Sequence, residues 1–130
     1  MKKLLLILTF GFICTAANAQ SIYIKGSKVG EIGGDGSVYI GGSKRGQIES
    51  DGDVMLVNGD KAGRISDGAI YNRGGDRIGS VGSDGAVYGS GGRIGQIEPD
   101  GDIYESGSKI GECKGARRDW VAAIVFFFFL

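Results

Sequence analysis

Three kinds of side chain in this sequence are of types that perform chemistry: recurring aspartates, one cysteine and regularly spaced tyrosines. The aspartates precede glycine in five turns, at Asp35, Asp51, Asp67, Asp84 and Asp100. Several carboxylates can bind a hard cation, but Asp-Gly is also the pair that a tight turn selects, and we interpret these residues as turn residues. The sequence contains no histidine, which excludes imidazole metal sites and a histidine base. We therefore expect no catalytic residues, no metal and no cofactor.

Cys113 and the tyrosines each admit a functional and a structural interpretation. Cys113 occupies a position that Ile or Val fills elsewhere, so we interpret it as a buried small hydrophobe rather than a nucleophile. All five tyrosines share one position of a repeat, at Tyr23, Tyr39, Tyr71, Tyr88 and Tyr104. They form a candidate ligand face that could stack on sugar rings, although cross-strand packing is the commoner role of a strand tyrosine.

These residues belong to a repeat that predicts the fold. Six units begin at Ile22, Val38, Val54, Ile70, Val87 and Ile103, spaced 16 or 17 residues apart. Each unit has a Gly-rich turn followed by Lys or Arg, and five Asp-Gly turns join the six units, which leaves four or five residues for each strand. We therefore expect each unit to be a pair of short antiparallel strands in a continuous meander.

The turns and the strand glycines predict further details of the fold. We interpret all five Asp-Gly turns as one type, a type I turn followed by a left-handed glycine bulge. A glycine lies two residues before the apolar position of each returning strand, at Gly30, Gly46, Gly63, Gly79, Gly95 and Gly111. We expect a tyrosine ring or a neighbouring strand to pack over it. The third unit gains one residue before its basic turn and loses one after Ile65, which inverts side-chain direction unless a bulge absorbs the change.

The first residues resemble an export leader. Lys2 and Lys3 precede the apolar run 4–13, and Ala17 and Ala19 form a cleavage site, so we expect residues 1–19 to be a signal peptide. The alternative of a lipoprotein modified at Cys14 lacks the small residues required before the cysteine. We expect the protein in the periplasm, at the cell surface or secreted. Without Lys2 and Lys3, the basic residues fall from 15 to 13 against 15 acidic ones, which gives no basic footprint for nucleic acid.

The C-terminal residues 116–130 form an apolar tail beyond the repeat domain of residues 20–115. Trp120 to Leu130 carries no charge, and as a helix it would be about 16 Å long, too short to span a bilayer. Such a segment must be hidden from water. It can plug the repeat domain, insert into one membrane leaflet with Trp120 at the interface, or contact a partner protein or a second copy of the chain.

The two turn series separate the charges. The basic residues of one series are Lys28, Lys44, Lys61, Arg77, Arg93 and Lys109, and the other series carries the turn aspartates. Consecutive strands run in opposite directions, so the two series lie at opposite ends of the domain. Solvated turn residues explain this pattern, and the opposite charges could also steer head-to-tail self-association.

The period, the glycines and the Asp-Gly turns over Ser21 to Gly115 resemble the five-fold β-flower proteins, small exported bacterial β-repeat proteins. The resemblance implies five hairpin units around a pseudo-five-fold axis, with the first and last strands helping to close the ring. The fold class we predict is all-β, a meander of short β-hairpin repeats of about 16 residues closed around that axis, with a short helical apolar segment at the C-terminus.

The function we predict is a non-catalytic structural or binding module of the bacterial cell envelope. A glycan-binding module that uses the tyrosine face is the alternative. An enzyme of unknown type is the third reading, because the sequence has carboxylates but no focused acid and base pair.

Overall fold

A computed structural model describes residues 19–130, so the predicted signal peptide lies outside the described residues, apart from Ala19. Twelve strands make up almost the whole repeat domain. They are β1 (Gln20–Ile24), β2 (Ser27–Ile32), β3 (Ser37–Ile40), β4 (Ser43–Ile48), β5 (Asp53–Leu56), β6 (Lys61–Ser66), β7 (Ala69–Asn72), β8 (Arg77–Val81), β9 (Ala86–Gly89), β10 (Gly92–Ile97), β11 (Asp102–Glu105) and β12 (Ser108–Glu112). Each of the six repeat units forms one hairpin, as the repeat predicts.

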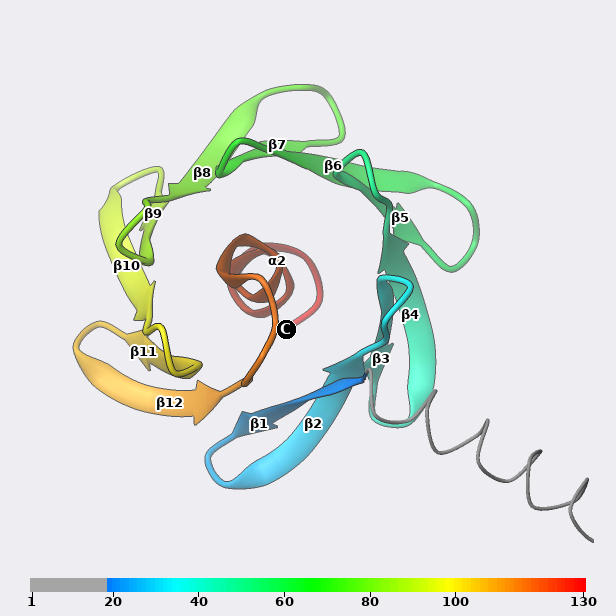
Figure 1. The fold of residues 1–130 in the computed structure, drawn as a ribbon. Coiled ribbons are helices and arrows are strands. Elements are labelled where there is room, and N and C mark those ends of the chain that lie inside the picture. The colour runs from blue at the N-terminus through cyan, green and yellow to red at the C-terminus, as the bar shows by residue number, and fades with distance from the viewer. Residues whose placement is uncertain (1–18) are drawn as a thin grey trace, which may run out of the picture.

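The strands form one closed antiparallel sheet (Figure 1). Each strand pairs with its neighbours in the chain, and β1 pairs with β12, with Tyr23 opposite Glu112 and Ile24 opposite Gly111. The all-β meander closed by its first and last strands is therefore confirmed. The ring contains six hairpins, β1–β2 to β11–β12, where the resemblance implied five. The reason is that every one of the six repeat units in the sequence folds into its own hairpin.

The turns between hairpins, here called the Asp-Gly turns, are of two types. In four of them the glycine has a φ of +89° to +97°, at Gly36, Gly52, Gly85 and Gly101, and its N–H donates to the carbonyl three residues earlier. These four are the predicted type I turn with a glycine bulge. The prediction is wrong for the turn after Ile65, where Asp67 and Gly68 both have positive φ, 49° and 80°. That geometry is a two-residue type I′ turn, which needs one residue fewer.

The shorter turn explains how the irregular third unit keeps its register. The turn within each hairpin, here called the petal turn, is longer in the third and fourth hairpins, spanning 57–60 and 73–76. The lost and gained residues therefore all lie in turns. The paired strands keep Ile65 opposite Ile70 and Val54 opposite Gly63. Each hairpin also has one β-bulge at the same place, between its basic residue and its strand glycine, as between Lys28 and Gly30.

The first apolar residue of every unit points into the ring. Ile22, Val38, Val54, Ile70, Val87 and Ile103 are all fully buried. The apolar residues of the returning strands form a second layer, in which Ile32, Ile48, Ile97 and Cys113 are equally buried. The next residue of each unit, the tyrosine in five of six units, points to the opposite face, because side chains alternate along a strand.

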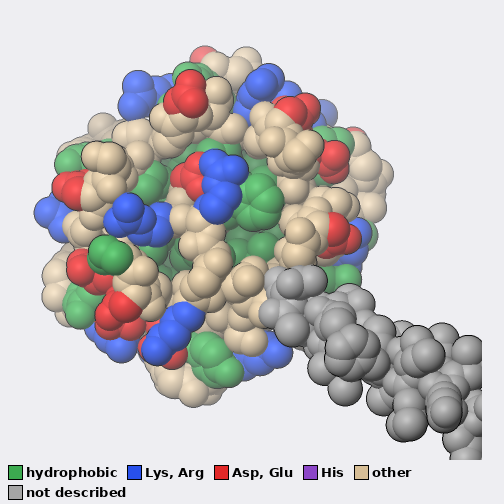
Figure 2. All heavy atoms as spheres, viewed as in Figure 1, with side chains coloured by type: hydrophobic (Ala, Val, Ile, Leu, Met, Phe, Trp, Pro, Cys, Tyr) green, Lys and Arg blue, Asp and Glu red, His purple; other side chains and the backbone are tan. Residues whose placement is uncertain are grey.

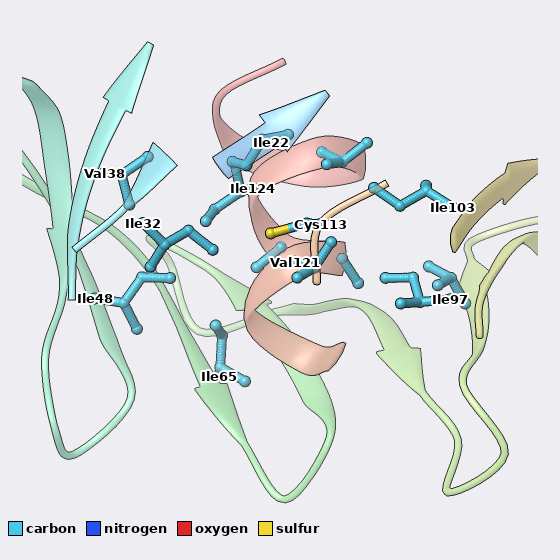
Figure 3. Close-up of a cluster of buried hydrophobic side chains, with 14 of the residues drawn as sticks. Ile22, Ile32, Val38, Ile48, Ile65, Ile97, Ile103, Cys113, Val121 and Ile124 are labelled. Atoms are coloured by element: carbon cyan, nitrogen blue, oxygen red, sulfur yellow. The ribbon is translucent and has the colours of Figure 1, made fainter. Parts of the chain in front are cut away.

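The apolar tail lies inside the ring (Figure 1). It forms helix α2 (Arg118–Ala122), which continues as the wider π-helical segment η1 (Ala123–Phe128). The two apolar layers of the ring surround Val121 and Ile124 (Figure 3), and 121–124 is completely buried. Of the three fates expected for the tail, the observed one is packing into the repeat domain. Among residues 19–130, no helix has the length and apolar character needed to cross a bilayer.

The strand glycines accommodate this tail. A Cβ atom on Gly46, Gly63, Gly79 or Gly95 would lie 2.3 to 2.9 Å from the Cζ atom of a phenylalanine of the tail. The four rings occupy these positions in reverse chain order, Phe129 at Gly46, Phe128 at Gly63, Phe127 at Gly79 and Phe126 at Gly95. The prediction that a tyrosine ring covers these glycines is therefore wrong, because the tyrosines point outward. The alternative, a neighbouring strand, is confirmed, since each glycine also lies against a backbone carbonyl of the next hairpin.

Candidate functional site

The outward face of the ring carries the predicted ligand residues. Each tyrosine stands opposite a residue of the preceding hairpin, such as Glu31 opposite Tyr39 and Gln96 opposite Tyr104. The ring closes this pattern, because Tyr23 stands opposite Glu112 of the last hairpin. Tyr23 and Tyr88 are 37% and 40% exposed, whereas Tyr39, Tyr71 and Tyr104 are half-buried. The structure therefore places the five tyrosines at five separate junctions and does not gather them into one site.

Three of these junctions form equivalent clefts between neighbouring hairpins. Each is lined by a basic residue, the apolar bulge residue, the strand glycine and the polar residue of one hairpin, and by the tyrosine or petal turn of the next. The first has a volume of 340 Å³ and is lined by Lys28, Val29, Glu31 and Tyr39. The second, of 290 Å³, is lined by Arg77, Ile78, Ser80 and Tyr88. The third, of 440 Å³, is lined by Arg93, Ile94, Gln96 and Tyr104.

In the first and third clefts, the polar side chains hold one another in position. Lys28 Nζ donates to Glu31 Oε1 at 2.9 Å, and Arg93 Nη2 donates to Gln96 Oε1. The hydrogen bond to Glu31 raises the pKa of Lys28. Gln96 Nε2 donates in turn to the carbonyl oxygen of Asp84 at 2.8 Å, which ties the cleft to an Asp-Gly turn. Each cleft thus offers an aromatic wall and a basic side chain, which is held by the Glu31 carboxylate in the first cleft and by the Gln96 amide oxygen in the third, whereas the second cleft offers the Ser80 hydroxyl.

The turn aspartates serve the backbone. Asp35, Asp51, Asp84 and Asp100 each accept the N–H two residues later through Oδ1, at 3.0 to 3.1 Å. The hydrogen bond from the Ser37 N–H lowers the pKa of Asp35. Within residues 19–130, no three His, Cys, Asp or Glu side chains lie close enough together to hold a metal ion. Their hydrogen bonds show that four of the five turn aspartates stabilise turns, as interpreted from the sequence, whereas Asp67 lies in the turn of the other type.

Cys113 is a core residue. Its side chain is 1% exposed and belongs to the inner layer of the ring (Figure 3). Burial raises the pKa of its thiol to about 11, so the nucleophilic thiolate is scarce at neutral pH. The interpretation as a small hydrophobe is confirmed.

The sequence analysis did not predict which residues stand opposite the tyrosines, nor that the phenylalanines of the tail cover the strand glycines. Each tyrosine stands opposite the basic residue of its own hairpin on one side and a residue of the preceding hairpin on the other, as Tyr39 stands opposite Lys44 and Glu31. The recurring polar residue one position after each strand glycine was the available signal, at Glu31, Gln47, Arg64, Ser80, Gln96 and Glu112. Its fixed position relative to the repeat marks the second wall of every junction.

The closed ring of hairpins with repeated outer clefts defines a β-hairpin repeat protein. Comparison with protein-family models matches residues 19–130 to the family described as 5-fold beta-flower protein. The chain belongs to this family, a small repeat fold that is not a known enzyme family. No curated protein and no solved structure matches the chain.

Proposed function

We propose that this protein is a non-catalytic binding module of the bacterial cell envelope and that its ligands occupy the clefts between hairpins. The observation that supports this role is the recurrence of one cleft plan at three junctions of the ring. Export rests on the leader at residues 1–19, read from the sequence. A rigid ring with equivalent sites favours a ligand that itself repeats, because simultaneous engagement of several weak sites multiplies affinity.

The cleft chemistry favours glycans as the ligand class. A sugar ring presents an apolar C–H face and a rim of hydroxyls, which matches an aromatic wall beside charged donors and amide or carboxylate acceptors. The volumes of 290 to 440 Å³ lie at the small end of ligand sites, which suits one sugar unit in each cleft. Envelope polysaccharides supply repeating units to a ring of such clefts.

Calorimetry with a panel of bacterial envelope oligosaccharides tests the proposal. We expect the variant Y39A/Y88A/Y104A to lose at least about tenfold in affinity, because the stacking wall of each cleft is removed. The matched control is Y39F/Y88F/Y104F, which keeps the ring and loses only the hydroxyl, and it should retain most of the binding. Equal thermal stability of the two variants shows that the fold is intact. Unchanged binding by the alanine variant would place the ligand elsewhere.

Cell fractionation tests the envelope location separately. The full chain with its leader should yield a processed protein in the periplasmic, surface or medium fraction. If the protein keeps its leader and remains in the cytoplasm, the proposed envelope location is wrong. Ligand binding in the clefts is then tested by calorimetry alone.

A further inference from the structure

The two ends of the ring carry opposite charge. Leaving aside the ion pairs of Asp53 and Asp102 along the outer wall, the end with the petal turns has seven basic residues, Lys25, Lys28, Lys44, Arg45, Arg73, Arg77 and Arg93, against the acidic residues Asp60, Asp76 and Glu105. The end with the Asp-Gly turns has eight acidic residues, Asp35, Glu49, Asp51, Asp67, Asp84, Glu98, Asp100 and Asp119, against Lys114, Arg117 and Arg118. A domain that is almost neutral overall is therefore a strong dipole along its axis.

Much of this charge is unpaired. Asp53, Asp102, Lys61 and Lys109 form ion pairs along the outer wall of the ring. Within the described part of the chain, Lys44, Arg45, Arg73 and Arg77 have no carboxylate within ion-pair distance, and neither Glu49 nor Glu98 has a basic partner. These side chains remain available to an external partner of opposite charge.

The two ends also differ in their apolar centres. The chain enters the ring at the Asp-Gly end, where Arg118 Nη2 donates to the carbonyl oxygen of Ser83, and the tail runs toward the petal end. There, the tail finishes with the half-buried rings of 126–129 and with Leu130, which is 50% exposed. At the Asp-Gly end, a hollow of 520 Å³ beside the helix has a mixed lining, with apolar Ile32, Ala116 and Trp120 and polar Gln20, Asp35 and Arg117. Figure 2 shows acidic side chains around this face with basic ones between them, and charged side chains over the hydrophobic ones at its centre.

We propose that copies of this protein stack head to tail along the ring axis, with the petal end of one copy receiving the Asp-Gly end of the next. Basic side chains then meet acidic ones at the rim, and Leu130 with its neighbouring rings meets the central hollow. The petal turns extend outward from the ring (Figure 1), which spreads the basic side chains over the rim of that end. The contact uses two different surfaces, so it does not close and each added copy offers the same free ends. The clefts on the outer wall stay open in such a stack.

Sedimentation velocity on the chain from Gln20 tests the stacking. We expect the weight-average sedimentation coefficient to rise with protein concentration in low salt. Raising the salt from about 20 mM to about 500 mM should weaken the association at least tenfold, because the screening length becomes shorter than the spacing of rim charges. A wild-type protein that is monomeric at millimolar concentration in low salt would overturn the proposal.

Two variants, each blocked at one end, give a sharper test. K44E/R45E/R73E blocks the petal end, and E49K/S50K/E98K blocks the Asp-Gly end. Each variant alone should be monomeric, whereas an equimolar mixture should form a dimer, since one intact surface of each kind remains. The control is R64E on the outer wall, which should associate like the wild type. If the mixture stays monomeric while the wild type associates, the contact is not head to tail.

The same variants separate stacking from membrane binding. Vesicles of phosphatidylglycerol provide an anionic surface that could also attract the petal end. If the wild type binds these vesicles but does not self-associate, and if K44E/R45E/R73E no longer binds them, the petal end contacts a lipid surface and stacking is overturned.

Discussion

The strand glycines are the residues on which the packing of this protein depends. Gly79 lies beneath the ring of Phe127, with a backbone carbonyl of the next hairpin on its other side. A strand glycine is normally unfavourable, because it adds backbone entropy to the unfolded chain and packs no side chain. Here the missing side chain is replaced by a ring from the tail. In the first and last hairpins, Ile40 and Ile24 supply that cover at Gly30 and Gly111.

Replacing Gly79 with alanine tests this close packing. The new Cβ would lie 2.3 Å from Phe127 Cζ and 2.5 Å from the carbonyl oxygen of Tyr88, and the backbone oxygen cannot move without breaking the sheet. We expect a loss of about 3 kcal/mol in the free energy of unfolding, measured by urea denaturation. Gly74→Ala is the matched control, because its Cβ would meet only Asn72 Oδ1 at 3.5 Å, and it should cost no more than about 0.5 kcal/mol. Equal costs would contradict the packing role.

The buried thiol of Cys113 should make the folded protein less stable at alkaline pH. Burial raises the pKa of the folded thiol to about 11 from its ordinary value of 9.0, so between these values the unfolded chain loses the proton while the folded chain keeps it. Stability is therefore unaffected by this group below the lower value and decreases as the pH rises through the window. At about pH 10.5, we expect Cys113 to lower the free energy of unfolding by about 2 kcal/mol relative to about pH 8.

The variant C113V isolates this effect from the other groups that titrate at high pH. Valine suits the position because Val81 fills the equivalent one in the fourth hairpin. Urea denaturation of both proteins at the two pH values should show the wild type losing more stability than C113V. Parallel pH profiles would mean that the thiol is solvated in the folded protein.

At the scale of elements, the geometry of η1 matches the spacing of the hairpins. Consecutive side chains of an α-helix are about 100° apart, whereas six hairpins are spaced on average 60° apart around the axis. The wider π-helix turns less per residue, and Phe129 N donates to the carbonyl oxygen of Ile124, five residues earlier, at 3.1 Å. This widening brings four consecutive phenylalanines closer to the angular positions of four consecutive hairpins. A π-helix is rare, and here the ring that surrounds it provides the physical reason.

Inserting one alanine between Val125 and Phe126 should disrupt this match. The insertion rotates all four rings away from their glycines, and we expect a loss of about 4 kcal/mol or more in the free energy of unfolding. The control adds the same alanine after Leu130, which leaves every ring in register and should change stability little. Urea denaturation measures both, and equal stability of the two variants would mean that the rings pack without a fixed register.

The hairpins could be predicted from the sequence, whereas the fate of the tail could not. Periodicity locates Val38 and Tyr39 on opposite faces because both lie in one short strand, and Asp-Gly marks its turns through local backbone preferences. The contact of Phe129 with Gly46 joins residues far apart in the chain, and nothing local distinguishes a plug from a leaflet anchor in an apolar run. The sequence shows that the turn at Asp67 and Gly68 is one residue shorter than the other Asp-Gly turns. Its backbone type depends on the register of the flanking strands, which the sequence alone does not give.

At the scale of the whole molecule, closure of the ring makes one cooperative unit out of six repeats. An open array of repeats has end units with fewer contacts, and its stability is roughly a sum over neighbours. In this ring, β1 pairs with β12, and the N–H of Lys25 donates to the carbonyl oxygen of Ile110 at 2.8 Å across the seam. The helix on the axis then links the hairpins a second time, through the core that all of them share. No hairpin occupies an end position.

Equivalent substitutions at the seam and far from it should therefore cost the same. Ile22 lies on β1 at the seam and Ile70 on β7 across the ring, and both are fully buried in the same layer. We expect Ile22→Ala and Ile70→Ala each to lower the free energy of unfolding by about 3 kcal/mol and to differ by less than about 1 kcal/mol, since both leave a cavity of similar size against the helix. Hydrogen exchange of the strand amides in each variant should show all hairpins losing protection together. If the seam opens on its own, Ile22→Ala should lower the free energy of unfolding much less than Ile70→Ala. Faster exchange would then be confined to β1 and β12, which is the behaviour of an open arc and not of a closed ring.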